Sequence, residues 1–404
     1  MTDRPVAWIG IDAGKTGHHA AAVGAEGEVL WSQKVANDQT AIEELINRSG
    51  KTAGEVHWAV DLTSNAAALL LAVLVTTGQR VVYVPGRVVH RMSGVFRGEA
   101  KTDAKDARII AETARLRRDL TEVTTPDELV IELSRLTAYR SDLMDDWVRG
   151  INRLRDLLTS IFPALERALD YSTRSALILA SGLCTPDEMH QAGAGGLTTH
   201  LREHGAHRAS IPSVVGKALD AAAKQTVSLP GETTTAELIK RLARQLLELD
   251  REIKDTDKLI TERFREHPQS PIIESLPGMG PHLGAEFVVA TAGDLAAFAT
   301  SGRLASYAGL VPVPQDSGRV SGNLRRPKRY NRRLRRVFYM AALSSIRSTD
   351  GPSRAFYQRK RSERLVHTQA LLALARRLVD VLWALLRDGR LFTPTTPTPG
   401  APTA

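Results

Sequence analysis

Cysteine is nearly absent from this sequence of 404 residues, in which Cys184 is the only one. A single cysteine excludes an internal disulfide framework and any cysteine-based zinc site. The 11 histidines do not recur at the spacing of metal ligands. No uninterrupted apolar stretch is long enough to cross a bilayer, and the first residues lead directly into a strand-like run. We therefore expect a cytoplasmic protein that does not bind membranes.

The length and the charge of the chain set wider bounds. At 404 residues the chain exceeds what one hydrophobic core usually holds, so we expect two or three domains. Hydrophobic residues make up 43% of the chain and charged residues 25%, which is typical of a soluble globular protein. The formal net charge of +9 favours a polyanionic partner over an acidic small metabolite.

The N-terminal part of the sequence has the pattern of an α/β layer. Apolar runs at 6–11, 19–23 and 29–35, separated by Gly-containing turns, predict three sequential antiparallel strands. The pattern then predicts a helix at 40–47, a strand at 56–60, a helix at 65–76 and a strand at 80–84. This order predicts an RNase H-like fold, in which the first strand is central and the fourth lies beside it.

Four aspartates occupy positions that this fold would bring together. Asp12 ends the first apolar run, and Asp61 ends that of the fourth strand. Asp103 and Asp106 lie in the opening turn of a helix predicted at 102–118, where they can share one face. Clustered carboxylates repel one another unless a cation joins them, and hard oxygen ligands suit Mg²⁺ or Mn²⁺. Because paired ions of that kind serve in-line attack on phosphodiesters, the cluster predicts phosphoryl transfer on nucleic acid.

The middle of the chain has the spacing of long helices. Apolar residues recur every three or four positions over 129–161 and again, more regularly, over 239–260. Spacing alone leaves open whether the two helices form an intramolecular hairpin or a coiled coil with a second subunit. Residues 172–231, between them, have the pattern of short helices broken by Gly and Pro, and 392–404 is a Thr- and Pro-rich tail predicted to be disordered.

The C-terminal third contains a second group of motifs. The segment Leu276-Pro-Gly-Met-Gly-Pro before an apolar helix resembles the turn of a helix-hairpin-helix, whose backbone amides can hold a phosphate. A plain turn between two helices is an equally good interpretation.

A strongly basic run follows that turn. From Arg319 to Arg336 there are nine Lys or Arg residues and no acidic residue, with Tyr330 interleaved. Such a run can be a solvated surface, but its density favours a nucleic-acid backbone. Lys101 and Lys105, beside the paired aspartates, either screen their repulsion or contact nucleic acid. The predicted nucleic-acid-binding residues are Lys101, Lys105, Arg319, Arg325, Arg326, Lys328, Arg329, Arg332, Arg333, Arg335 and Arg336.

Taken in order, these motifs resemble the DEDD transposase family of bacterial insertion sequences, whose members act as bridge-RNA-guided recombinases. The resemblance rests on Gly10-Ile-Asp12, Lys101-Thr-Asp103-Ala-Lys-Asp106, the helical middle, Leu276-Pro-Gly-Met-Gly-Pro, Ala308-Gly-Leu-Val-Pro through Ser317-Gly, and then Leu334-Arg. It implies a RuvC-like domain at 1–120, a helical, coiled-coil-like region at 121–270 and a mostly helical transposase domain at 271–391, followed by the tail at 392–404.

The resemblance also implies roles for single residues. Asp12, Asp103 and Asp106 match three of the four metal-binding acids, and Asp61 stands where the family has glutamate, one methylene longer. Ser317 matches the serine nucleophile, with Ser321 as a close competitor. The implied partners are donor and target DNA, a structured bridge RNA, and further copies of the chain, as a dimer that assembles to a tetramer.

Three other functions fit parts of the sequence. A metal-dependent junction resolvase would use the same acids with water in place of serine. An actin-like or sugar-kinase-like ATPase is suggested by Gly10-Ile-Asp-Ala-Gly-Lys-Thr, although that function leaves the paired aspartates and the basic run unexplained. In a non-catalytic nucleic-acid-binding protein, the acids would only cap helices.

Overall fold

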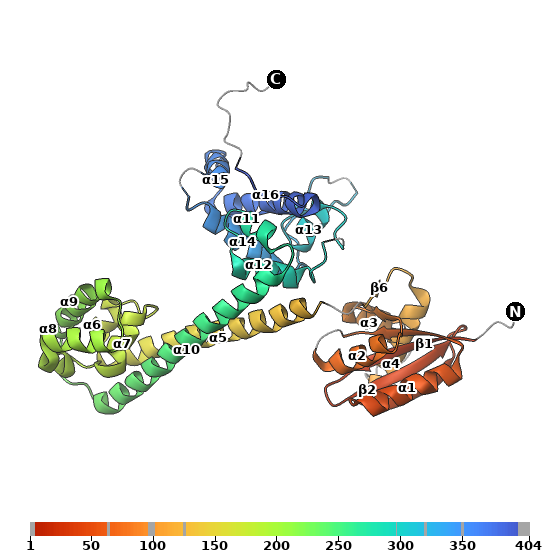
Figure 1. Ribbon diagram of the computed structural model, residues 1–404, viewed down its shortest axis with the longest axis horizontal. Helices are drawn as coiled ribbons and strands as arrows, with labels where there is room; N and C mark the ends of the chain where they lie inside the picture. Colours follow the sequence, from red (N-terminus) through yellow and green to blue (C-terminus); the bar gives the residue numbers. More distant parts are fainter. Residues whose placement is uncertain are drawn as a thin grey trace, which may run out of the picture. The chain divides into compact units, whose positions relative to one another are not determined.

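The chain forms two compact units, Met1–Pro126 and Asp127–Ala404. The computed structural model describes residues 5–62, 65–95, 102–123, 127–295, 297–318, 321–348 and 351–394. Figure 1 draws unit 1 in red and orange and unit 2 from yellow to blue. Unit 1 is α/β and unit 2 is almost entirely helical, so the predicted combination of an α/β part and an all-α part is confirmed. The finer domain boundaries inferred from the resemblance stay a prediction.

Unit 1 contains a mixed sheet of six strands in the order β3-β2-β1-β4-β5-β6. The strands are β1 Val6–Ala13, β2 Gly17–Gly24, β3 Val29–Ala36, β4 Glu55–Val60, β5 Val81–Tyr83 and β6 Thr121–Glu122. β1 is antiparallel to β2 and parallel to β4, so the first strand is internal and the fourth lies beside it, as predicted. The five strands expected from the sequence are present. The sixth, β6, was missed because two exposed residues carry no apolar periodicity.

Helices cover both faces of this sheet. They are α1 Gln39–Thr52, η1 Asn65–Ala67, α2 Ala68–Thr76, α3 Gly86–Ser93 and α4 Asp103–Leu116. One face buries Ile9 and Ile11 together with Ile42 of α1 and Leu70 of α2. The other face packs on α3 and α4. Burial on both faces explains why the central strands are continuous apolar runs without strict alternation.

Gly10 sets how closely α4 approaches the sheet. A Cβ atom at this position would lie 2.2 Å from the Ala107 carbonyl oxygen and 2.3 Å from the Ala111 backbone nitrogen. Only glycine allows the helix backbone to lie directly on β1. The contact fixes the position of the first turn of α4 relative to the end of the strand.

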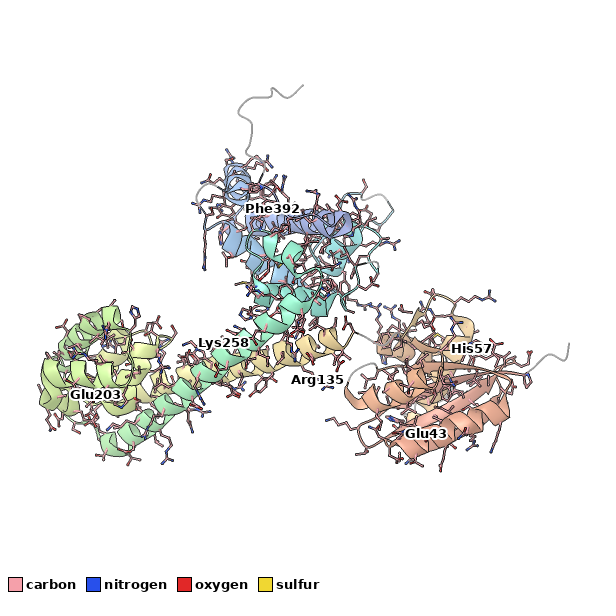
Figure 2. All side chains as sticks on the ribbon, in the orientation of Figure 1. Glu43, His57, Arg135, Glu203, Lys258 and Phe392 are labelled. Atoms are coloured by element: carbon pink, nitrogen blue, oxygen red, sulfur yellow. The ribbon has the colours of Figure 1, made fainter. Side chains whose placement is uncertain are left out.

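Unit 2 is organised around two long antiparallel helices, α5 Glu128–Ile161 and α10 Glu232–Glu266. The two helices pack side by side, as Figure 1 shows, so the intramolecular hairpin is confirmed. In Figure 2, Arg135 marks α5 and Lys258 marks α10 in the region where they run side by side.

Each end of the α5–α10 pair belongs to a separate hydrophobic core. Leu154 and Leu158 of α5 join Ile239 of α10 in a core with the helices between them. Those helices are α6 Pro163–Ala168, α7 Arg174–Gly182, α8 Pro186–Glu203, η2 Arg208–Ser210 and α9 Ile211–Ala222. Leu133 of α5 and Phe264 of α10 join the core of the C-terminal elements.

The C-terminal elements form the rest of unit 2. They are α11 Ser270–Ser275, α12 Pro281–Ala290, α13 Ser301–Tyr307, β7 Val313–Pro314, β8 Leu324–Arg325, α14 Arg332–Ser345, α15 Pro352–Ser362 and α16 His367–Asp388. The turn between α11 and α12 is the predicted hairpin. Its Gly278 has a φ of +83°, and a Cβ atom there would lie 2.1 Å from the Ala341 carbonyl oxygen of α14. Glycine is therefore required both for the turn and for its packing on α14.

No helix within the described ranges is both long enough and apolar enough to pass through a membrane. The predicted tail at 392–404 falls for the most part outside the described residues, which end at 394.

Candidate active site and nucleic-acid interface

The two strand-end aspartates lie beside each other at the carboxyl ends of the adjacent strands β1 and β4. β1 and β4 pair in parallel with Ile11 opposite Val60, so Asp12 and Asp61 follow at neighbouring positions. The Asp61 Oδ1 atom accepts a hydrogen bond from the Ala13 N–H at 3.4 Å. This bond holds the Asp61 carboxylate near the carboxyl end of β1.

The second pair of aspartates lies in the first turn of α4. Thr102 is the N-cap residue, and its hydroxyl oxygen accepts a hydrogen bond from the Lys105 N–H at 3.2 Å. Asp103 and Asp106 occupy the turn that follows. Carboxylates near a helix N-terminus are favoured by the helix dipole, so this placement alone is compatible with a capping role.

The contact of α4 with Gly10 brings the two pairs to the same end of the sheet. Gly10 and Asp12 are two positions apart on β1 and therefore share one face. α4 packs on that face, and its Ala107, the residue directly after Asp106, lies next to Gly10. The first turn of α4 consequently covers the end of β1 where Asp12 lies.

The charges in this region influence one another. Burial raises the pKa of Asp61 above its usual range; the Ala13 hydrogen bond opposes that rise, and the negative charge of Asp106 adds to it. A carboxylate that is partly removed from water beside another carboxylate favours a cation as its neighbour.

His19 is a member of this region that the sequence analysis missed. It lies opposite Asp12 in the β1–β2 ladder, and its Nε2 atom is 2.8 Å from the Ser32 hydroxyl. Burial lowers the pKa of the His19 imidazole, and the charge of Asp103 opposes that shift. The signal that could have revealed it is the pairing of two strands across the short turn after Ala13, which places His19 and Asp12 on one face.

The four predicted metal ligands fit a hard divalent ion by their chemistry. All four are carboxylates, which is the donor type that Mg²⁺ and Mn²⁺ prefer. The raised pKa of Asp61 means that its ionised form is disfavoured when no cation lies nearby. Among the described residues, no three His, Cys, Asp or Glu side chains are close enough together to hold one ion. Binding would therefore require the aspartate side chains to turn toward a common point.

Both candidate serines lie in one hairpin loop of unit 2. β7 and β8 are antiparallel, and the loop is closed by a hydrogen bond from the Gln315 N–H to the Asn323 carbonyl oxygen at 2.8 Å. The Asp316 carboxylate accepts a further hydrogen bond from the Asn323 N–H at 3.0 Å. Ser317 and Ser321 are both exposed. Exposure suits a nucleophile that must reach a phosphate, but it does not choose between the two serines.

Three arginines of the basic run are engaged inside unit 2. Arg335 donates to the Gly309 carbonyl oxygen at 2.6 Å, and Arg336 forms an ion pair with Glu286 of α12. Arg333 donates to a hydroxyl group on α5 at 3.4 Å. These three contribute to the packing of α14 against the rest of unit 2.

The other described cations of the run are exposed, as Arg336 is. They are Arg325, Arg326, Lys328, Arg329 and Arg332, and Arg326 donates to the Tyr330 hydroxyl at 3.0 Å. Exposed guanidinium and ammonium groups are available to phosphate oxygens, which bind such groups without reading base sequence. Two predicted nucleic-acid-binding residues, Lys101 and Arg319, lie outside the described residues, and Lys105 is half-buried at the start of α4.

Comparison with known proteins covers both parts of the chain. A family model described as "Transposase" matches residues 9–163, and a second, described as "Transposase IS116/IS110/IS902 family", matches residues 270–358. The chain is 55% identical over 391 residues to the 44.8 kDa protein of insertion element IS116 from Streptomyces clavuligerus, which covers 96% of this chain and 97% of that protein. It is 50% identical to the 42 kDa protein of insertion element IS900 from Mycobacterium paratuberculosis, over 98% of this chain and 99% of that protein. The chain belongs to the IS116/IS110/IS902 family of transposases.

Family membership gives the candidate site its general chemistry. Transposases cut and rejoin DNA, so the chain is an enzyme whose substrates are DNA. The family also implies catalysis that depends on a divalent metal, without deciding which ion. The first matched region contains all four aspartates and the second contains Ser317 and the basic run. The resemblance inferred from the motifs is confirmed, and the ATPase alternative is set aside.

Proposed function

We propose that this transposase cuts and rejoins DNA strands through a covalent phosphoserine on Ser317, assisted by a divalent metal that Asp12, Asp61, Asp103 and Asp106 hold on an RNase H-like sheet. The observation that carries the proposal is the contact of α4 with Gly10, because it brings two separate pairs of aspartates to one end of the sheet. The strand order β3-β2-β1-β4-β5, with the first three strands antiparallel, supports the RNase H-like assignment.

The serine step is a balanced phosphoryl transfer. The Ser317 Oγ atom forms a bond to phosphorus, the bond from phosphorus to the leaving sugar oxygen breaks, and that oxygen takes up a proton. The serine proton passes to a nearby base, because a neutral alcohol is a poor nucleophile. Attack by the hydroxyl of another strand reverses these bonds and releases the serine. The intermediate keeps the phosphodiester bond energy, which suits rejoining better than hydrolysis.

Other residues of the chain would stabilise the phosphorane and bind the metal. Arginines of the basic run would stabilise the negative charge of the phosphorane, as positively charged groups do in other phosphoryl transfers. The four carboxylates would hold Mg²⁺ or Mn²⁺, which when bound supplies Lewis-acid polarisation of a phosphate oxygen. Both sets must act on the same phosphate, whichever copy of the chain supplies each.

Trapping of the covalent intermediate tests the serine. The purified transposase is denatured during the reaction with its insertion-sequence DNA, and the protein–DNA adduct is digested and sequenced by mass spectrometry. The proposal expects the phosphate on Ser317 and no adduct from Ser317→Ala, with Ser321→Ala as the matched control from the same loop. An unchanged adduct in Ser317→Ala would move the role to Ser321 or to another residue. DNA cleavage without any adduct would favour water as the nucleophile, as in a junction resolvase.

We further propose that a structured bridge RNA chooses the DNA sites. The family resemblance and the exposed basic run support this, because phosphate contacts alone carry no base information and guide pairing would supply it. Ribonuclease treatment of the purified complex should abolish site-specific recombination and leave general DNA binding. Recombination that persists after complete removal of RNA would contradict the proposal.

The proposed oligomer is a dimer that assembles to a tetramer on DNA. Joining two duplexes requires several active sites, and closed symmetric assemblies supply them from copies of one chain. Light scattering with and without DNA tests this, and a monomer that recombines at full rate would exclude it.

A further inference from the structure

A second concentration of positive charge lies on α15 and on the part of α16 that packs against it, outside the basic run. From Arg354 to Arg377 there are seven Lys or Arg residues and one acidic residue, Glu363. The sequence analysis predicted no nucleic-acid contact for any of the seven. We use the name α15 surface for the five that gather at the end of α15, which are Arg359, Lys360, Arg361 and Arg364, together with Arg377 of α16.

The half-buried ring of Phe356 collects three of these cations. The Cζ atoms of Arg359 and Arg377 lie 5.1 Å and 5.2 Å from the centre of the ring, and the Nζ atom of Lys360 lies 5.8 Å from it. A cation above an aromatic ring is attracted to its face. Three like charges around one ring also repel one another, so an anion beside them would stabilise the arrangement.

Carboxylates neutralise little of this charge. The Glu363 oxygens lie 2.6 Å from the Lys360 Nζ atom and 3.9 Å from the Arg359 Nε atom. Within the described part of the chain, the other three cations of the α15 surface form no ion pair, and all three are exposed. Five cations and one carboxylate leave a formal charge of about +4 for an outside partner to neutralise.

Exposure alone does not account for this imbalance. Three exposed cations of α10 each have an acidic partner on the same helix. The pairs are Arg251 with Glu248, Lys254 with Asp250, and Lys258 with Asp255. Surface cations of unit 2 are therefore neutralised locally on α10 and left without that neutralisation on the α15 surface.

The backbone at Arg364 gives a second observation. This residue follows the C-cap residue Glu363 and has a φ of +67°, a left-handed conformation that favours glycine at this place. A cation near a helix C-terminus is favoured by the dipole, but the last turn of α15 already has three. Arg364 is therefore held in a strained conformation that adds a further exposed cation, and an anionic ligand would offset the strain.

The position of the α15 surface indicates how long its partner must be. The basic run includes the start of α14, and Ile346 at the other end of that helix is roughly 20 Å away at 1.5 Å per residue. Arg354 of α15 donates to the Ile346 carbonyl oxygen at 3.0 Å. Figure 1 shows α15 beside one end of α16 and α13, which precedes the basic run, beside the other. A duplex with about one phosphate per 3.4 Å of each strand covers such a distance in roughly six base pairs.

We propose that the α15 surface binds the phosphate backbone of duplex DNA, as a second phosphate-binding surface that acts together with the basic run. Duplex DNA is the partner because the family acts on DNA and because its regular phosphates complement a group of exposed guanidinium groups. The inference requires only that the chain binds DNA. It is independent of Ser317, of the four aspartates, of the metal and of a guide RNA.

Binding of duplex DNA by the full chain tests the proposal, in chelator so that no strand is cut. The probe is a fluorescein-labelled duplex that contains the end of the insertion sequence, and fluorescence anisotropy gives Kd at several salt concentrations. The variant combines Arg359→Gln, Arg364→Gly and Arg377→Gln. We expect its Kd to rise at least about tenfold at low salt, and the salt dependence of log Kd to fall by roughly 0.9 for each phosphate contact that is lost.

The single variant Arg364→Gly separates binding from folding. Glycine adopts a positive φ without strain, so this variant should melt at the same or a higher temperature while its Kd for the duplex rises. Ala292→Gly is the matched control, because Ala292 has a φ of +53° and its replacement changes no charge. Its Kd should equal that of the unsubstituted protein.

A second control removes three positive charges elsewhere in unit 2. It combines Arg251→Gln, Lys254→Gln and Lys258→Gln on α10, where each cation has an acidic partner. Its Kd and salt dependence should change much less than those of the α15 variant. An equal loss of affinity in the α10 variant would overturn the proposal, because net charge would then be the cause.

An unchanged Kd for the duplex in both α15 variants would also overturn the proposal. A fluorescein-labelled RNA hairpin is measured in parallel. If only the affinity for this RNA falls, the α15 surface binds RNA, and the assignment to duplex DNA is wrong. None of these results bears on the serine adduct, which is measured in the presence of metal on cleavable DNA.

Discussion

The aspartates of unit 1 and the candidate serine of unit 2 are held by different kinds of structure. Asp12 lies near the end of a strand that is buried on both faces, and Asp106 precedes a helix residue in direct contact with that strand. Ser317 lies in an exposed loop between two strands of two residues each. Side chains on packed elements are positioned by many neighbours, whereas a loop is positioned by a few hydrogen bonds.

This contrast matches the work proposed for each group. Four like charges can hold a metal only if the scaffold resists their repulsion, and a two-sided core provides that resistance. A nucleophile that attacks one strand and then releases it to another benefits from a position open to both strands. The comparison therefore predicts that unit 1 is sensitive to changes in packing and that the loop is sensitive to changes in chemistry.

The largest effect is expected from the charge of the acidic cluster. Asp12→Asn keeps the size of the side chain but removes one anionic ligand, so strand exchange should fall by at least about 10³-fold, as it does when essential catalytic groups are removed. Recombination is measured on insertion-sequence DNA with and without chelator. Asp38→Asn is the matched control, because Asn caps a helix as well as Asp and Asp38 is the N-cap residue of α1. Full activity of Asp12→Asn, or of the unsubstituted enzyme in chelator, would show that the aspartates do not take part in catalysis.

The next effect tests the packing of unit 1 without touching a polar group. In Gly10→Ala the new Cβ atom would collide with the backbone of α4, so the helix must shift away from β1. Overpacking of this kind costs about 1–3 kcal/mol, and a displacement of about 1 Å at catalytic groups can lower the rate 10²-fold. Thermal unfolding and hydrogen exchange of the α4 peptides measure the first effect, and recombination measures the second.

Gly50→Ala is the control for that substitution. Gly50 lies in α1, and a Cβ atom there would meet nothing within 4 Å, so alanine should leave activity unchanged and stabilise the helix slightly. If Gly10→Ala recombines as well as Gly50→Ala, the position of α4 on β1 is not what organises the site.

A smaller effect is expected from two groups of basic residues in the run, those that are free to bind phosphate and those that hold unit 2 together. Replacement of Arg325, Lys328 and Arg329 by alanine should weaken DNA binding and reduce the salt dependence of log Kd by roughly 0.9 for each phosphate that the variant no longer neutralises. Replacement of Arg335, which donates to Gly309, should instead lower the melting temperature. Fluorescence anisotropy at several salt concentrations makes the distinction. A large change in salt dependence for Arg335→Ala alone would show that the structural role of that residue is the minor one.

The sequence was sufficient for the parts of the fold that leave a periodic apolar pattern. It predicted the central position of the strand that carries Asp12, the neighbouring strand that leads to Asp61, and a helix at 102–118, and the structure has β1 and β4 in these places and α4 at Asp103–Leu116. It did not predict β6, because two exposed residues have no periodicity. It also missed His19, because a histidine within an apolar run is conspicuous only after the strand pairing is known.

The packing of α12 on α14 shows a second limit of sequence reasoning. The Gly-Met-Gly turn was visible as a motif, but Glu286 and Arg336 are separated by 50 residues and become a pair only through the packing of α12 on α14. No local pattern reveals that the Glu286 side chain is buried, with only 8% of the residue exposed. The serine step, the metal and the guide RNA are proposals inferred from motifs.

The smallest predicted effect concerns the stability of metal-free unit 1. Burial, and secondarily the charge of Asp106, raises the pKa of Asp61 above its usual value of 3.8 in the folded protein. The protonated form therefore adds stability that is present below pH 3.8 and is lost as the pH rises through the folded-state pKa. Asp61→Asn cannot ionise and so does not lose this stability as the pH rises. In chelator, the melting temperature of Asp61→Asn should exceed that of the unsubstituted protein by a small amount at pH 8 and by less at pH 4. Addition of Mg²⁺ should narrow the difference at pH 8, because the ion would stabilise only the protein that retains all four carboxylates. A lower melting temperature for Asp61→Asn at pH 8 in chelator would mean that the hydrogen bond from Ala13 outweighs the charge repulsion, and that unit 1 does not need a cation to hold its aspartates together.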